Sequence, residues 1–303
     1  MRRIHQLLPA AAALLASAWA CGDTPTSFER EVPADPRGIV EIASTAGTVD
    51  VTAWDRAAVA VKAELGPEVD HVELTSSGNH TVVRVQLKHH GMGGFEGGHE
   101  ETHLRVQVPK ESEVDASTVS ANLTSSGVQG IQRLKSVSGD VAAELGPSDF
   151  DAKSVSGTMK LRGHGQPARL HVTTVSGDIE LKHAAGELEA TSVSGEVSVE
   201  VNPARSVRLR STSGDITFDG RLLRGADLDA VSVNGDLKVR AASEDGFQYE
   251  ARSLSGDIRD CFNAKAERSS EYGPGEKLNG TRGTGAAHVR LKTMSGEIDL
   301  CDH

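Results

Sequence analysis

The residue pattern most suggestive of chemistry is a histidine-rich segment in the first third of the chain. His99 and His103 are spaced as in H-E-x-x-H, the zinc-binding pattern of metalloproteases. That pattern requires a helix, because only there do residues four apart converge on one metal ion. Here a Gly-rich stretch precedes it and an alternating strand pattern follows, and residues four apart in a strand are separated by about 13 Å. The context therefore argues against a metalloprotease.

Four histidines in and beside this segment could still supply nitrogen ligands to Zn, Cu or Ni. They are His89, His90, His99 and His103. Their spacing fixes no coordination geometry, and a solvated hairpin loop explains them as well. We treat them as weak metal candidates, and no cofactor is predicted.

The N-terminal residues have the pattern of a secretory signal. Arg2 and Arg3 precede an apolar stretch that is too short to span a bilayer. Cleavage before Cys21 suits both a small-x-small site and a lipoprotein box, so ordinary soluble secretion is an alternative. Lipoprotein maturation acylates a Cys at the first mature position. We predict a signal peptide over residues 1–20, lipidation of Cys21 and a tether over residues 21–28.

Location and charge narrow the range of partners. Gly22 follows Cys21, in place of the Asp that retains lipoproteins at the inner membrane, which predicts the outer membrane of a Gram-negative cell. The net charge is −11, and removal of residues 1–20 takes away two of 32 basic and none of 43 acidic residues, which makes it −13. An acidic chain with interspersed charges is a poor ligand for nucleic acid. The membrane is contacted through the lipid anchor only.

An internal repeat must position the remaining residues of interest. Copies of Ser-x-Ser-Gly-Asp place glycines at Gly139, Gly157, Gly177, Gly195, Gly214, Gly235, Gly256 and Gly296. Some copies have Thr for the first Ser, Asn for the second, or Glu or Thr for Asp, and a degenerate copy has Ala121 in the glycine position. Successive spacings are 18, 18, 20, 18, 19, 21, 21 and 40 residues. A period of about 20 residues is typical of a solenoid.

Apolar residues alternate with polar ones on both sides of each glycine. They fall two and four residues after it, and seven and five residues before it, so each coil has two strands with one buried face. The residue two before the glycine, such as Val155, is also apolar, which predicts a one-residue slip of phase there. The prediction is an all-β fold, a right-handed parallel β-solenoid of 18–21-residue coils.

Two polar columns follow from stacking the coils. Hydroxyls align at Ser136, Ser154, Thr174, Ser192, Ser211, Ser232, Ser253 and Thr293, and carboxylates at Asp140, Asp178, Glu196, Asp215, Asp236, Asp257 and Glu297. Stacked hydroxyls can bond one another and the corner backbone, so no catalytic serine is invoked. The carboxylates either bond corner amides and hydroxyls, which we favour, or hold weakly bound Ca²⁺.

Both ends of the repeat region differ from its middle. Residues 29–110 contain other alternating runs of apolar and polar residues and a degenerate first copy of the repeat around Gly47. We therefore predict a β-hairpin region that caps the solenoid. The solenoid itself is predicted over residues 111–303. Residues 262–285 are Gly-rich and polar, and are predicted to loop out of it.

Cys261 and Cys301 each lie five residues after their own repeat glycine, Gly256 or Gly296. If residues 262–285 loop out, the two coils are neighbours, and residues in one column lie about 4.8 Å apart, within reach of a disulfide. If the interval hides another coil, the separation is about 10 Å and no bond forms. Export supplies an oxidising compartment, so we predict a disulfide that pins the terminal coil.

The chain resembles the bacterial putative-adhesin family of unknown function, β-strand-repeat proteins with serial SGDI motifs. The resemblance covers about residues 28–303. It rests on the G-x-V-x-V segment from Gly47, the Val108-Pro109 strand end and the serial Ser-Gly-Asp/Glu copies. It implies a β-helical fold and an adhesin-like surface role, and it supplies no catalytic residues. Ala121, Asn122, Thr158 and the His-rich segment depart from the family pattern.

These observations favour a non-enzymatic cell-envelope lipoprotein that presents a rigid, repetitive β surface to an envelope, surface or matrix ligand. A periplasmic accessory or envelope-stress protein without adhesive role is the alternative. A polysaccharide-active β-helix enzyme is disfavoured, because such sites need aromatic subsites and aromatics make up 3% of this chain. There is also no nucleophile elbow, phosphate loop or His/Cys dyad.

Overall fold

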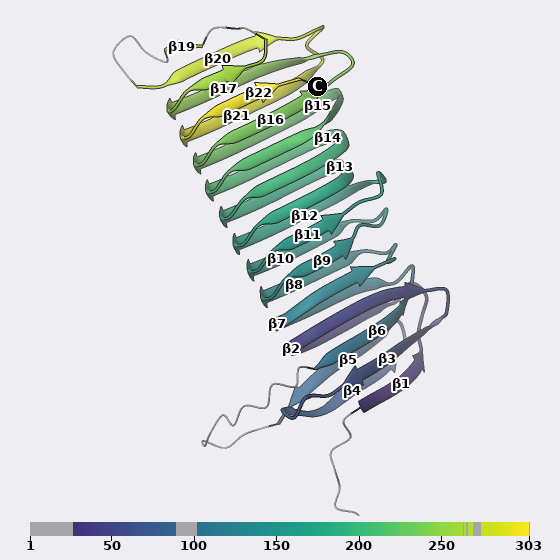
Figure 1. The fold of residues 1–303 in the computed structure, drawn as a ribbon. Helices are drawn as coiled ribbons and strands as arrows, with labels where there is room; N and C mark the ends of the chain where they lie inside the picture. The colour runs from purple at the N-terminus through teal and green to yellow at the C-terminus, as the bar shows by residue number, and fades with distance from the viewer. Residues whose placement is uncertain (1–26, 89–101, 263, 265, 269–273, 303) are drawn as a thin grey trace, which may run out of the picture.

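The protein is described by a computed structural model covering residues 27–88, 102–262, 264, 266–268 and 274–302. All regular structure in these ranges is β, with 22 strands and no helix. The strands form an elongated stack of coils with the N-terminal strands at one end (Figure 1). The all-β prediction is confirmed.

The N-terminal end of the stack is built from six strands. They are β1 (Ser27–Pro33), β2 (Ile39–Trp54), β3 (Ala58–Glu64), β4 (Val69–Ser77), β5 (His80–Leu87) and β6 (His103–Pro109). β2 pairs in parallel with β7 (Glu113–Ser126), with Gly47 opposite Ala121, so its segment is a coil in register with the repeats. On its other side, β2 pairs in parallel with β5 and β6. Antiparallel pairs β1–β3, β3–β6 and β4–β5 extend this end.

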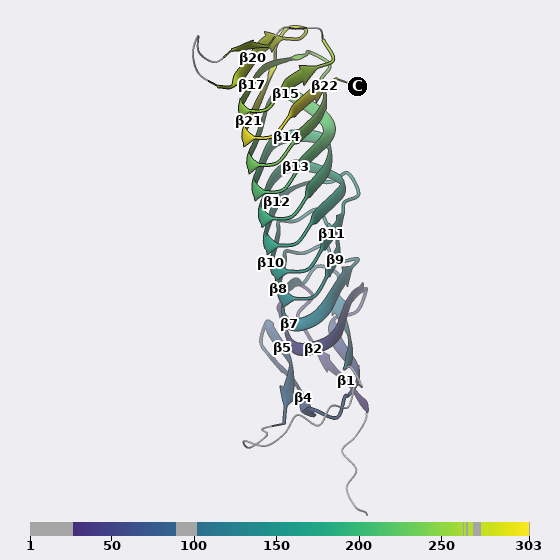
Figure 2. The same ribbon diagram turned by 60° about the vertical axis from the view of Figure 1, so that its left-hand side comes forward.

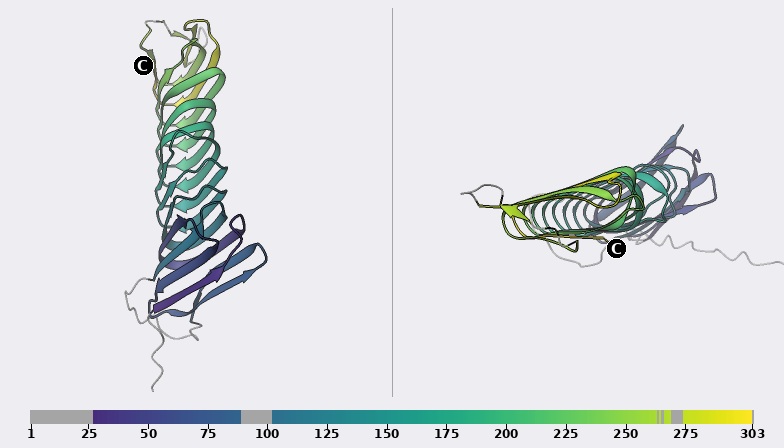
Figure 3. Two further views of the ribbon diagram at one scale, coloured as in Figure 1. Left: turned by 90° about the vertical axis from the view of Figure 1, so that its right-hand side faces the viewer. Right: turned by 90° about the horizontal axis from the view of Figure 1, so that it is seen from above.

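The coils that follow form two parallel ladders, one on each side of the glycine corner. The strands are β8 (Gln132–Ser138), β9 (Val141–Glu144), β10 (Phe150–Ser156), β11 (Met159–Arg162), β12 (Pro167–Ser176), β13 (Ile179–Ser194), β14 (Val197–Ser213), β15 (Ile216–Asn234) and β16 (Leu237–Ala242). The pre-glycine ladder runs through β8, β10 and β12, and the post-glycine ladder through β9 and β11. The corners align along one side of the stack (Figure 2), and the coils superpose in the view from above (Figure 3).

The core is a narrow column of aliphatic side chains between the two ladders. Ile179, Val197 and Ile216 occupy one register position in successive coils and are at most 1% exposed. Alternation in each strand matches the pattern expected for one buried face: in β11, Met159 and Leu161 are buried and Lys160 and Arg162 are exposed. Aliphatic side chains from every coil thus form one continuous core.

The predicted slip of phase before the glycine is wrong. The serine three before the glycine faces the core, and the residue two before it faces solvent: Ser154 is 5% exposed and Val155 is 48% exposed. The inward position lies beside corner carbonyls that need a donor. Ser154 Oγ donates to the carbonyl of Ser156 at 3.1 Å, which a valine could not do. The change of phase instead occurs across the glycine.

Close approach of successive corners explains the repeat glycines. A Cβ on Gly157 would lie 2.3 Å from the carbonyl oxygen of Gly139, and one on Gly195 would lie 2.2 Å from that of Gly177. Both are shorter than any van der Waals contact, and Gly157 and Gly195 also have φ of +117° and +141°. Glycine is therefore required at the corner by both contact and conformation.

The last coil of the chain is not the last coil of the stack. β21 (Ala287–Ser295) and β22 (Ile298–Cys301) pair on one side with β15 and β16, and on the other with β17 (Phe247–Ser255) and β18 (Ile258–Asp260). The C-terminal coil therefore lies between two coils that precede it in sequence (Figure 1). Its place in the stack therefore differs from its place in the sequence.

Within residues 262–285, the structure describes two further strands. They are β19 (Glu267–Arg268) and β20 (Glu276–Thr281). β20 pairs antiparallel with β17 and covers the edge of the final coil. Part of the segment predicted to loop out therefore adds a strand to the sheet, antiparallel to the strand of the coil beside it. Antiparallel pairing satisfies an edge that would otherwise be open to further strands.

Candidate binding surface

Several sequence-predicted sites fall outside the described residues: Cys21, His89, His90 and His99. His103 begins strand β6, and its Nδ1 lies 2.7 Å from Thr48 Oγ1. Within the described ranges, no three His, Cys, Asp or Glu side chains are grouped closely enough to hold a metal ion. The same ranges contain no helix of the length and apolarity needed to cross a membrane.

The structure joins Cys261 to Cys301 by a disulfide, with the two Cα atoms 5.0 Å apart. They lie at the ends of adjacent strands, since β18 pairs directly with β22. The bond links the terminal coil of the stack to the C-terminal coil beneath it. The repeat predicts that the two cysteines occupy the same column of adjacent coils, and this register brings the two sulfurs together.

Four of the aspartates beside the glycines cap backbone amides of the next coil. The N–H of Glu196 donates to Asp178 Oδ1 at 2.9 Å, and the N–H of Asp236 donates to Asp215 Oδ1 at 2.8 Å. The same contact is made by Asn122, Asp140 and Asp236, at 2.8–3.0 Å. These amides sit at the corner, where the strand ladder is interrupted, so the side chain replaces a missing carbonyl partner.

The hydroxyl column is buried and bonds mainly to corner carbonyls. Ser253 Oγ donates to Gly296 O at 3.0 Å, and Thr293 Oγ1 donates to Gly235 O at 3.1 Å. Thr174, Ser192 and Ser211 have hydroxyls without a hydrogen-bond partner among the described residues. No bond between neighbouring hydroxyls of this column is seen in the part of the chain described. These hydroxyls face away from solvent, and their role in the corner is structural.

A shallow groove lies on the outer face of the pre-glycine ladder. One hollow of about 960 Å³ spans β14, β15, β21, β17 and β20, and a second of about 370 Å³ spans the coils from β8 to β14. Both hollows are lined by Ser206 and Arg208, so they form one continuous groove along the ladder. The groove is lined mainly by the outward side chains six and eight residues before each glycine.

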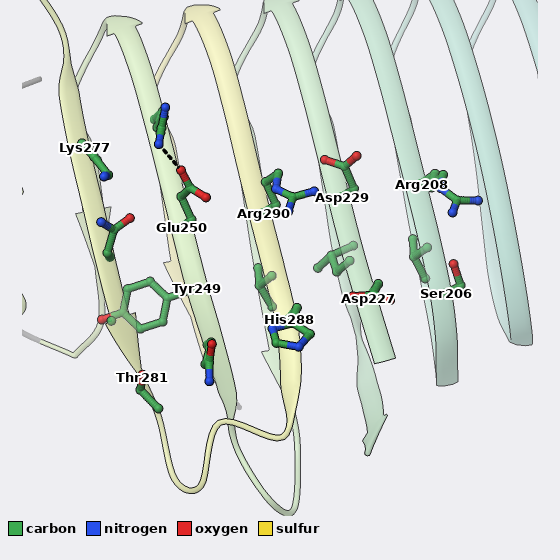
Figure 4. A pocket seen from close by; sticks show the side chains of 17 residues that line it. Ser206, Arg208, Asp227, Asp229, Tyr249, Glu250, Lys277, Thr281, His288 and Arg290 are labelled. Atoms are coloured by element: carbon green, nitrogen blue, oxygen red, sulfur yellow. Dashed lines mark ion pairs between the residues drawn. The ribbon is translucent and has the colours of Figure 1, made fainter. Parts of the chain in front are cut away.

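Charges of both signs alternate along the floor of this groove. In spatial order, Arg208, Asp229, Arg290 and Glu250 share one register column across four coils (Figure 4). Neither Arg208 nor Arg290 forms an ion pair with another described residue, whereas Asp229 and Glu250 pair with Arg210 and Arg252. The two exposed guanidinium groups are therefore available to a ligand.

Tyr249 packs beneath the end of the groove, with its hydroxyl 3.5 Å from Asp260 Oδ2. Burial raises the pKa of this phenol, and the neighbouring Asp260 carboxylate raises it further. Its ring also contacts Phe247 and Phe262 edge-on or tilted. Aromatic packing thus closes the core at this end of the stack.

The chain matches the Toastrack DUF4097 family over residues 39–301. It belongs to that family. The match includes β2 and ends at Cys301, so it covers every coil of the stack in this Toastrack chain. No match to a curated protein was found.

Three solved structures are similar to this Toastrack chain at low sequence identity. A putative adhesin from Parabacteroides merdae is 12% identical, with 91% of this chain and 96% of that chain covered and a TM-score of 0.37. A putative lipid binding protein from Parabacteroides distasonis is 11% identical, with 91% and 97% covered and a TM-score of 0.38. A putative cell adhesion protein from Clostridium sporogenes is 10% identical, with 91% and 100% covered and a TM-score of 0.28.

Sequence reasoning identified the charged outward positions of the Toastrack repeats only as a solvated face. The signal that could have found the groove is the alignment of columns six and eight residues before each glycine. Arg208 and Arg290 share the first of these columns, as the register shows. The alignment could not show the hollow itself, which depends on how the coils stack.

Proposed function

We propose that the chain is a non-enzymatic cell-envelope protein whose coils form a parallel β-solenoid with a rigid, repetitive surface for binding, in an adhesin-like role. The observation that carries this proposal is the continuous groove of the pre-glycine ladder, since its two hollows share Ser206 and Arg208. Because the backbone of every coil is paired with its neighbours, the groove is preformed and binding orders little of the chain. An elongated ligand from the envelope, a surface or the matrix fits such a shape.

The charge of the groove selects the kind of ligand. Exposed Arg208 and Arg290 can each donate two parallel hydrogen bonds to a carboxylate or phosphate. The intervening Asp229 disfavours a densely charged polyanion. An extended polymer with spaced acidic groups, such as an acidic polysaccharide, suits this alternation better.

Binding to immobilised acidic polysaccharide tests the proposal. The double variant Arg208→Ala/Arg290→Ala is expected to lower affinity at least about tenfold, since loss of a charge-assisted hydrogen bond costs about 1.5–3 kcal/mol. Lys160→Ala/Lys238→Ala removes the same charge from the exposed face of the post-glycine ladder and is expected to bind as the wild type. Equal affinity of all three proteins would contradict the proposed role of the groove.

Anchoring through a lipid at Cys21 is the second part of the proposal. It is supported by the basic and apolar residues before Cys21 and by the polar tether after it. Membrane fractionation should place the wild type with the outer membrane and release Cys21→Ala into the soluble fraction. Release of both proteins would contradict anchoring. Protease treatment of intact cells should degrade a surface-facing protein and spare a periplasmic one.

A further inference from the structure

An apolar column runs along the corner edge of the stack. Eight large apolar side chains are exposed in the described ranges, and seven of them occupy the position two before the glycine. They are Val119, Val137, Val155, Val175, Val193, Met294 and Leu254, each 44–53% exposed. Thr212 and the half-buried Val233 fill the remaining positions from Val119 to Leu254. Exposed aliphatic residues aligned over a whole molecule indicate an interaction surface.

The columns beside this apolar column have opposite charges. The next outward position in the strand, four before the glycine, carries bases and no acids from Ser117 onward: Lys135, Lys153, Arg210, Lys292 and Arg252. Across the corner, the position after the glycine carries acids and no bases: Asp140, Asp178, Glu196, Asp215, Asp236, Glu297 and Asp257. The apolar column therefore has a basic border on one side and an acidic border on the other.

We propose that this edge binds a second copy of the chain, with the two stacks side by side and parallel. A two-fold axis along the stack brings the apolar columns together and places the basic border of each copy opposite the acidic border of its partner. An antiparallel pair would instead place base against base and acid against acid. Charge complementarity therefore selects the parallel arrangement.

Both borders keep their charges accessible. Each of the capping carboxylates bonds a backbone amide through Oδ1, as Asp178 does with the N–H of Glu196, which leaves Oδ2 free. Lys135 pairs with Asp115 of the neighbouring coil and Lys153 with Asp151 of its own strand, both at 3.3 Å, but the two lysine side chains are 51% exposed. Exposed pairs of this kind contribute at most about 1 kcal/mol, so they do not hold the ammonium groups away from a partner.

The size of the edge fits a specific interface. At about 4.8 Å per coil, the column from Val119 to Leu254 is about 40 Å long. With its two borders, the strip is about 20 Å wide, which gives about 800 Å² on each copy, the usual size for a stable protein pair. The parallel arrangement also puts both N-terminal ends on the same side.

Molar mass in solution tests whether this edge is the interface. Light scattering on the exported chain carrying Cys21→Ala should give twice the monomer mass. Val155→Asp/Val175→Asp alters only exposed positions, and should reduce the mass twofold. The matched control Ser198→Asp/Thr217→Asp lies on the outer post-glycine face and should remain dimeric. A monomeric wild type would overturn the proposal, and so would a dimer that persists in Val155→Asp/Val175→Asp.

Oxidative cross-linking tests the direction of the two copies. Val119 and Leu254 lie at opposite ends of the apolar column, and each faces its own counterpart in a parallel pair. Val119→Cys and Leu254→Cys, each made in the Cys21→Ala chain, should both form covalent dimers when alone. Covalent dimers that form only when the two variants are mixed would show an antiparallel pair and overturn the proposed arrangement.

Discussion

At the residue scale, the glycine of each repeat motif and the acid after it have different structural roles. Glycine lets two corners approach closely, since any side chain on Gly157 would overlap the Gly139 carbonyl. That approach leaves the next amide without a strand partner, and the acidic side chain accepts its hydrogen bond. Asn122 makes the same contact with the N–H of Asp140, so the shape of the side chain matters more than its charge.

This interpretation predicts a difference between two changes at Asp178. Asp178→Ala leaves the N–H of Glu196 without its 2.9 Å acceptor, and should destabilise the fold by about 1–2 kcal/mol. Asp178→Asn keeps an acceptor oxygen in place and should cost less than half as much. Chemical denaturation followed by circular dichroism measures both. Equal losses would mean that the negative charge, and not the hydrogen bond, stabilises the corner.

Burial predicts a second pair of outcomes. Val197 is 0% exposed, so Val197→Asp places an uncompensated charge in the core and should cost several kcal/mol. Glu180 points outward from the neighbouring coil and pairs with Lys182, which lowers the pKa of its carboxyl. Glu180→Lys should therefore change stability little. Thermal unfolding compares them, and similar shifts would contradict the observed strand faces.

At the element scale, the two strands of each coil could be predicted because their alternation has a period of two. The corner could not, because hydropathy alone assigns Val155 to the core and Ser154 to solvent. In the structure the corner carbonyls need donors, so the hydroxyl takes the inward position. The register of Cys261 with Cys301 needed only the column position, which the repeat supplies.

The terminal coil carries a prediction about alkaline pH. Burial raises the pKa of Tyr249 above its unfolded value of about 10. As the pH rises above 10, the phenol therefore ionises in the unfolded chain before it ionises in the folded protein. The stability that the neutral phenol contributes below that pH is lost as the pH rises through the folded pKa. Tyr249→Phe should reduce the loss of stability between pH 9 and 11. Denaturation midpoints across this range measure it, and an unchanged pH dependence in the variant would contradict the assignment.

At the scale of the whole molecule, coils contact only their neighbours, so their order matters more than their number. The order of the last two coils could not be predicted, because the copies around Gly256 and Gly296 carry similar residue types in their corner columns. Either could lie next to the coil of Gly235. In the structure, a Cβ on Gly296 would meet Gly235, and one on Gly256 would meet Gly296, which places the C-terminal coil between the other two.

Engineered disulfides can test this order. Asp229 lies opposite Arg290 on adjacent strands, and Arg290 lies between Asp229 and Glu250 (Figure 4). Cysteines in the same column of adjacent coils are within bonding reach, as the 5.0 Å between the Cα atoms of Cys261 and Cys301 shows. Cysteines separated by an intervening coil lie about 10 Å from each other, which is too far for a disulfide. In the Cys21→Ala chain, Asp229→Cys/Arg290→Cys should therefore oxidise to a disulfide, and Asp229→Cys/Glu250→Cys should keep two free thiols. Peptide mass mapping after alkylation distinguishes them, and the reverse result would mean that the coils stack in the order of the sequence.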